Sequence, residues 1–119
     1  MTNVNFDDTI KAERKVMKMT EDERKQYLIE FGRRVRYYRE KLGIGQRELG
    51  RRAGYVDGAN PASSISKIEN GQMDISQTKV AEIAKALGVE PYDLIVSPQV
   101  SRLIKYAELI QKGDADVDI

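Results

Sequence analysis

Apolar residues recur at intervals of three and four along most of this chain, the spacing that gathers side chains on one face of an α-helix. The first such series follows Thr20 and Glu23, whose separation is typical of a capping box at a helix start. Gly43 supplies the end of this helix. Its predicted inward residues are Leu28, Phe31, Val35, Tyr38 and Leu42.

Two short helices are predicted next. QRELGRRAG is entered through Gly45 and ends at Gly54. The other begins at Asn60 and Pro61, because asparagine caps a helix well and proline suits the first helical position, where no backbone bond is lost. It closes at Gly71. The inward residues are Leu49 and Ala53 in one helix, and Ile65 and Ile68 in the other.

Three more helices complete the pattern. Ser76 caps the fourth, which ends at Gly88, and Pro91 opens a short fifth, EPYDLIV. After Ser97 and Pro98 a sixth amphipathic stripe follows, which either docks on the domain or pairs with its copy in a second chain. The predicted inward residues are Val80, Ile83, Ala84 and Leu87 in the fourth helix, and Leu94 and Ile95 in the fifth. The stripe of the sixth helix is formed by Val100, Leu103, Ile104, Ala107 and Ile110.

Composition narrows the chemistry. The 119 residues include no cysteine and no histidine, which excludes disulfides, thiolate nucleophiles, histidine acid/base pairs and the usual zinc ligands. No phosphate loop or paired-carboxylate pattern stands out, so we expect a binding protein rather than an enzyme, with no cofactor and no metal. With no signal peptide and no membrane-spanning apolar run, a cytoplasmic location is expected.

Charge is unevenly distributed although the net charge is only +1. Residues 31–54 hold eight basic and two acidic residues, so 8 − 2 gives +6, whereas residues 72–119 hold five basic and eight acidic residues, giving −3. A local basic block suits a polyanion such as DNA. A solvated arginine-rich helix face accounts for the charge equally well.

The order of these segments resembles the lambda-repressor-like (Xre/Cro-type) helix-turn-helix family over about residues 30–96. The resemblance is carried by the glutamine that opens the second helix, the I-S-x-I-E-x-G run and the I-A-x-A-L-G-V run. Each motif alone is weak, but together and in this order they are specific. The matching stretches are FGRRVRYYREKLGIGQRELGRRAGY, SSISKIENG and KVAEIAKALGVEPYDLI.

The resemblance implies an all-α fold of five helices, with the third entering the DNA major groove by its N-terminal residues. Here an N-terminal extension and an added C-terminal helix flank that fold. By position, the expected base contacts come from Ala62, Ser63, Ser66 and Lys67. The expected phosphate contacts come from Gln46, Arg47, Ser64 and Asn70.

Two further features follow from the resemblance. Arg39 and Glu69 occupy positions that many relatives join in an ion pair, so we expect a partly buried pair clamping the recognition helix. Ile65 lies eleven positions after Gly54, about five more than in most relatives, with the extra residues around Asp57 to Pro61. Together with Tyr55, this longer turn resembles that of prophage and mobile-element repressors. The extra loop either lies near the DNA backbone or is a surface loop with no role in DNA binding.

We therefore divide the chain into an N-terminal arm (1–19), a helix-turn-helix DNA-binding domain (20–96), an amphipathic helix (97–112) and an acidic tail (113–119). The predicted function is sequence-specific transcriptional regulation, as a repressor that binds double-stranded DNA as a homodimer on a two-fold related operator. The expected dimer residues are Val100, Leu103, Ile104 and Ala107.

Other functions on the same fold stay open. An antitoxin or partner-binding adaptor would use the arm or the tail to occupy another protein, such as a toxin. A restriction-modification controller is a third option within the DNA-binding class. If the chain is a repressor, its release from DNA requires another protein, such as an antirepressor, or a change in concentration.

Overall fold

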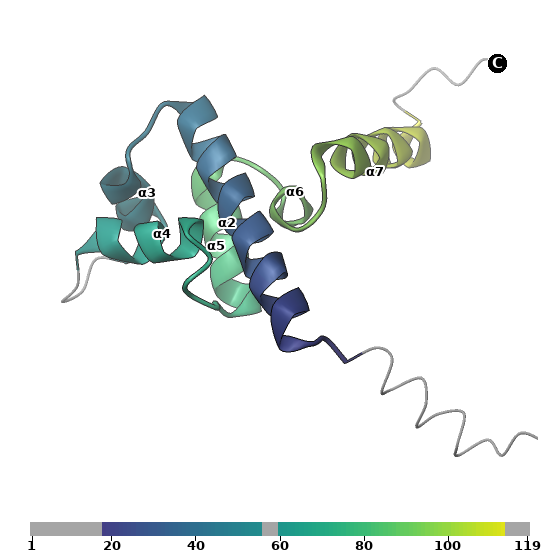
Figure 1. The fold of residues 1–119 in the computed structure, drawn as a ribbon. Coiled ribbons are helices and arrows are strands. Elements are labelled where there is room, and N and C mark those ends of the chain that lie inside the picture. Colours follow the sequence, from purple (N-terminus) through teal and green to yellow (C-terminus); the bar gives the residue numbers. More distant parts are fainter. Residues whose placement is uncertain (1–17, 56–59, 114–119) are drawn as a thin grey trace, which may run out of the picture.

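The computed structural model describes residues 18–55 and 60–113, and this part of the chain is all-helical, with no strand. Figure 1 shows α2, α3, α4, α5 and α6 gathered together, with α7 standing to one side. Most of the arm, most of the acidic tail and most of the extra loop lie outside the described residues, which include residues 18–19 of the arm, Gly113 of the tail and Asn60 and Pro61 of the loop. The helices are α2 (Glu21–Leu42), α3 (Gln46–Arg52), α4 (Pro61–Glu69), α5 (Gln77–Leu87), α6 (Pro91–Ile95) and α7 (Pro98–Lys112).

The predicted helix ends are present. The Thr20 hydroxyl accepts a hydrogen bond from the Glu23 N–H at 3.1 Å, so α2 begins where the cap predicts. The Glu23 carboxylate accepts from that hydroxyl at 3.2 Å, and this differs from the expected capping box, in which the carboxylate bonds the cap N–H. Gly43 ends α2 with a φ of 78°, a left-handed conformation that glycine adopts without strain.

The core lies between α2, α4 and α5 and is closed by α3 and α6. For two residues, the predicted inward position is wrong. Leu42 is 45% exposed because it is the last residue before the chain turns at Gly43. Ile95 is 42% exposed, because Leu94 takes the inward position of the one-turn α6. The buried core residues are Phe31, Val35, Leu49, Ala53, Ile65, Ile68, Ile83, Ala84, Leu87 and Leu94.

Close backbone contacts fix α4 at both ends. At the C-terminal end, a Cβ on Gly32 of α2 would lie 2.6 Å from the Glu69 carbonyl oxygen. At the N-terminal end, a Cβ on Gly50 of α3 would lie 2.7 Å from the Pro61 carbonyl carbon. Only glycine permits approaches this close, so α2 and α3 together hold α4 in one position.

Helix α7 is attached chiefly through one buried carboxylate. Asp93 of α6 is 1% exposed and accepts hydrogen bonds from the Ser101 hydroxyl and from Lys105 Nζ, the latter at 2.9 Å. In contrast, Leu103 is 67% exposed and Ser101 is the one buried residue of α7. The option that the apolar stripe of α7 docks on its own domain is therefore wrong. No described helix is long and apolar enough to cross a membrane.

Candidate nucleic-acid interface

Helix α4 has one buried side and one polar side. Ile65 and Ile68 point into the core, since each is at most 1% exposed. Ser63 and Lys67, which are four residues apart, and Asn70 beyond the helix end are exposed. A helix turns by about 100° per residue, which places these three on the side opposite the core. The structure thus brings two predicted base contacts and one predicted phosphate contact onto one solvent-facing surface, the recognition face.

The other predicted contacts on α4 lie at the margins of this face. Ala62, Ser64 and Ser66 are each half-buried. The Asn60 side chain accepts from the Ala62 N–H at 3.1 Å, which sets where the helix begins. Asn70 Nδ2 donates to Ser66 Oγ at 3.5 Å, a long contact that another hydrogen-bond partner can replace. The face carries hydroxyls, an amide and one ammonium group, which can donate to both bases and phosphates.

The Gln46 side chain makes a hydrogen bond within the protein. Its Nε2 donates to Glu69 Oε1 at 3.1 Å, so the side chain that was predicted to hold a phosphate bonds a buried carboxylate in the free protein. Arg47, the next residue of α3, is exposed and has no carboxylate within 4.0 Å among the described residues. The Arg47 guanidinium is therefore available to a phosphate group, whereas the Gln46 amide is already engaged by Glu69.

Arg39 and Glu69 form the expected contact. Arg39 Nε donates to Glu69 Oε2 at 2.6 Å and Nη2 donates to Oε1 at 3.0 Å, while Nη1 donates to the Ile44 carbonyl oxygen at 3.0 Å. The Arg39 side chain is 12% exposed and that of Glu69 is 4% exposed. The hydrogen bond with Glu69 raises the pKa of the Arg39 guanidinium above its usual value. The pair joins the end of α2 to the end of α4.

The basic block is only partly a free cationic surface. Arg34 donates to the Ile95 carbonyl oxygen at 3.1 Å, which ties α2 to α6. Arg36 bonds Glu40 at 2.8 Å, and Arg52 bonds Glu48 at 3.0 Å. The +6 count already subtracts Glu40 and Glu48, but it omits Glu69, which lies outside residues 31–54 and offsets the charge of Arg39. The block therefore offers DNA somewhat less positive charge than the count gives.

Sequence reasoning missed the residue that supports the end of α3. Lys79 Nζ donates to the Ala53 carbonyl oxygen at 3.0 Å and to Glu82 at 3.0 Å, and it lies 4.4 Å from the centre of the Tyr55 ring. Burial raises the pKa of the Tyr55 hydroxyl. The spacing of Lys79 and Glu82 indicates a pair within α5, but no pattern indicates a bond to a carbonyl group of α3.

The packing of α3 against α4, with a polar solvent face on the second helix, defines a helix-turn-helix protein. A helix-turn-helix family model matches residues 35–94, and the chain belongs to this lambda-repressor-like, Xre-type family. It is a DNA-binding transcription regulator of that family.

One solved structure gives a more particular likeness. The chain is similar to the restriction-modification controller protein C.AhdI from Aeromonas hydrophila, at 30% sequence identity and a TM-score of 0.52. The match covers 59% of this chain and 94% of that one. No curated protein matches the chain.

Proposed function

We propose that this protein is a sequence-specific repressor that binds a two-fold related operator as a dimer. The observation that carries the proposal is the recognition face of α4, a polar surface held in place by Gly32, Gly50 and the Arg39–Glu69 pair. A rigid, solvent-facing second helix of this kind suits insertion into the major groove.

Lys67 and Ser63 read base edges in this proposal. The Lys67 ammonium donates to guanine O6 and N7, and the Ser63 hydroxyl pairs with several bases. Ser66 and Ala62, nearer the margin, contribute a further hydroxyl and a methyl group for contact with a thymine methyl. Four small contacts of this kind give moderate specificity for each half-site.

Phosphate contacts flank these base contacts. Arg47 and Asn70, both exposed, contact the phosphates on either side of the groove, and Ser64 is a third, half-buried donor. Gln46 reaches a phosphate only if its amide leaves Glu69 or donates its second N–H group outward. Such contacts set the register of the protein on DNA without reading its sequence.

Dimerisation follows from the size of the recognition face. One helix-turn-helix unit reads only a few base pairs, and two half-sites supply the remaining affinity and specificity. Helix α7 is the proposed dimer element, because its exposed residues include Val100, Leu103 and Ala107. Ile104 is half-buried and contributes less. Repression then results from occupying a site that RNA polymerase requires.

Fluorescence anisotropy tests this proposal. The protein is titrated against the DNA upstream of its own gene and against a scrambled duplex of the same length, over a salt series. We expect binding to the native fragment to be at least about a hundredfold tighter, within the usual range for specific over non-specific sites. Equal binding to the two duplexes, with the same steep salt slope, would mean that the protein contacts phosphates without reading the base sequence. No binding to either duplex would favour the antitoxin or adaptor function.

A second candidate is a restriction-modification controller, favoured by the likeness to C.AhdI over nearly the whole of that chain. A controller would bind upstream of neighbouring endonuclease or methyltransferase genes as well as its own. Reporter assays with these promoters, with and without the protein, separate the two candidates. Activation of an adjacent endonuclease gene supports the controller, and repression confined to its own promoter supports the repressor.

A further inference from the structure

Two apolar surfaces of the described chain are left open to solvent. One is the stripe along α7, formed by Val100, Leu103, Tyr106, Ala107 and Ile110, with exposures of 42% for Val100, 67% for Leu103 and 54% for Tyr106. The other is a groove at the N-terminal half of α2. Exposed apolar patches of this kind mark interaction sites more often than an isolated exposed leucine does.

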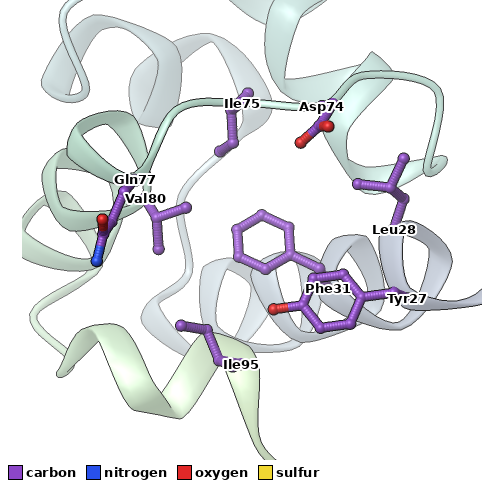
Figure 2. A pocket seen from close by; sticks show the side chains of 8 residues that line it. All are labelled: Tyr27, Leu28, Phe31, Asp74, Ile75, Gln77, Val80 and Ile95. Carbon is purple, nitrogen blue, oxygen red and sulfur yellow. The ribbon is translucent and has the colours of Figure 1, made fainter. Parts of the chain in front are cut away.

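The groove has a volume of about 320 Å³ and is lined mainly by apolar side chains. Figure 2 shows Phe31 in its middle, with Ile75, Val80 and Ile95 around it and Tyr27 beside Phe31. Tyr27 is 43% exposed and Ile95 is 42% exposed, so the opening is accessible. Its one charged lining residue is Asp74, which also pairs with Arg24 at 3.0 Å. We call this site the Tyr27 groove.

The chain cannot cover the stripe with its own core while α7 stays anchored. Ser101 and Lys105 face Asp93 of α6 through their hydrogen bonds. Leu103 and Ile110 lie about 200° and 180° around the helix from Ser101, since each residue adds about 100°. The stripe therefore points away from the domain that holds α7, and none of the described helices of the same chain covers it.

We propose that the α7 stripe of one copy docks into the Tyr27 groove of a second copy, and that the second copy docks its own stripe in return. The proposal rests on the dimer of the proposed function and specifies its interface. In a two-fold contact each pairing occurs twice, so one interface covers both stripes and both grooves. Pairing the two stripes with each other would leave both grooves open.

The areas and charges favour the reciprocal arrangement. A stable interface buries about 800 Å² on each partner, and one face of a four-turn helix with partly exposed side chains falls short of this area unless a second surface joins it. The groove is that second surface. Apart from Lys105, which is held by Asp93, helix α7 carries Arg102 and Lys112 against Glu108, a net +1, and the groove contains no basic lining residue.

Cysteine cross-linking tests the pairing directly, because the chain contains no cysteine of its own. An affinity-tagged Tyr27→Cys chain is mixed with an untagged Leu103→Cys chain, allowed to exchange subunits without DNA, and oxidised. We expect the tagged–untagged disulfide to dominate. Leu103→Cys alone should give at least tenfold less cross-linked dimer. Lys41→Cys mixed with Leu103→Cys gives the level of random collision, since Lys41 is exposed and outside the groove.

Dominant cross-linking of Leu103→Cys to itself would overturn the proposal in favour of stripe-on-stripe pairing. A mixed disulfide no more abundant than in the Lys41→Cys control would overturn it as well. Sedimentation of Leu103→Glu provides the second readout, with an expected rise of at least tenfold in the dimer dissociation constant, and an unchanged constant contradicts the interface. Since these measurements use no DNA, a protein that binds its operator but fails them retains the DNA-binding function and loses only this interface.

Discussion

The Arg39 guanidinium holds the Glu69 carboxylate in a two-point contact, with Nε to Oε2 at 2.6 Å and Nη2 to Oε1 at 3.0 Å, although the residues are 30 positions apart. Gln46 donates to the same carboxylate at 3.1 Å. Three helices, α2, α3 and α4, therefore meet at one buried carboxylate. Paired donors of this geometry are stronger than single hydrogen bonds and fix orientation as well as distance.

Truncating Glu69 should strongly destabilise the fold. Glu69→Ala leaves the Arg39 charge without its partner in a site where the arginine side chain is only 12% exposed. Loss of one member of a buried pair costs about 3–5 kcal/mol of unfolding free energy. Urea denaturation measures this loss. Glu40→Ala is the matched control, because it removes the exposed Arg36–Glu40 pair at 2.8 Å, and we expect no measurable change. Equal effects of the two substitutions would contradict the clamp.

Alanine at Gly32 should displace the recognition helix. The new Cβ would lie 2.6 Å from the Glu69 carbonyl oxygen, a backbone atom that cannot rotate away. We expect Gly32→Ala to lower the unfolding free energy by about 2–3 kcal/mol, the upper part of the range for overpacking. Gly45→Ala is the control, since a Cβ there meets no atom within 4 Å and φ is −82°. Its expected loss is about 0.5 kcal/mol, for a poorer cap. Similar losses would show that α4 does not depend on this contact.

Local patterns predicted the helices because helix ends are set by neighbouring residues. The Asn60 cap, the Ser76 cap, which accepts from the Lys79 N–H at 3.1 Å, and the glycine at the end of α2 act within one turn of the chain. The inward faces followed from spacing alone, except where a helix ended. Leu42 and Ile95 are such cases, because periodicity does not say where packing stops.

The site was predicted less completely, since its parts depend on long-range contacts. The positions of Ser63 and Lys67 followed from the family resemblance, but the bond between Gln46 and Glu69 joins residues 23 positions apart and has no local signal. Nothing in the sequence around Gly32 indicates that the backbone of α4 lies so close to it. Asp93 had no predicted role, although its partners Ser101 and Lys105 are 8 and 12 residues further on.

Removing the Lys67 ammonium should reduce sequence discrimination more than general DNA affinity. Lys67 is the one cation on the recognition face, and a good base contact provides about 1–3 kcal/mol of discrimination. We therefore expect Lys67→Ala to narrow the ratio of native to scrambled binding by about tenfold to a hundredfold in anisotropy titrations. Lys112→Ala removes the same charge from the end of α7, away from α4 in Figure 1, and should leave the ratio unchanged. An unchanged ratio in Lys67→Ala would exclude Lys67 from base reading.

Arg47 should act through phosphate instead of sequence. It is exposed on α3 and has no carboxylate partner among the described residues, so its charge is available to DNA. We expect Arg47→Ala to weaken native and scrambled binding by the same factor and to reduce the slope of log K against log salt by about 1. Arg36→Ala is the control, because that guanidinium is engaged by Glu40. A change in sequence preference would instead assign Arg47 to the bases.

The stability that Asp93 contributes by holding α7 should decrease as the pH falls. Burial opposes the charge of Asp93, but hydrogen bonds from Ser101, Lys105 and the Glu90 N–H outweigh it and hold the pKa of this carboxyl below its ordinary value of 3.8. Because the pKa is lower in the folded state, the stabilisation is fully present above pH 3.8 and is lost as the pH falls through the folded pKa.

Asp93→Asn isolates this contribution, since it keeps the shape of the side chain and removes the charge. At neutral pH we expect the unfolding free energy of the variant to be about 1.5–3 kcal/mol lower than that of the wild type, the range for hydrogen bonds to a charged group. The difference should shrink as the pH falls below 3.8. Urea denaturation over a pH series measures it, and hydrogen exchange in α7 locates it. Glu48→Gln removes a surface carboxylate paired with Arg52, outside the Tyr27 groove, and should follow the wild type throughout. A difference that stays constant as the pH falls would mean that the asparagine disturbs packing and that the charge of Asp93 does not anchor α7.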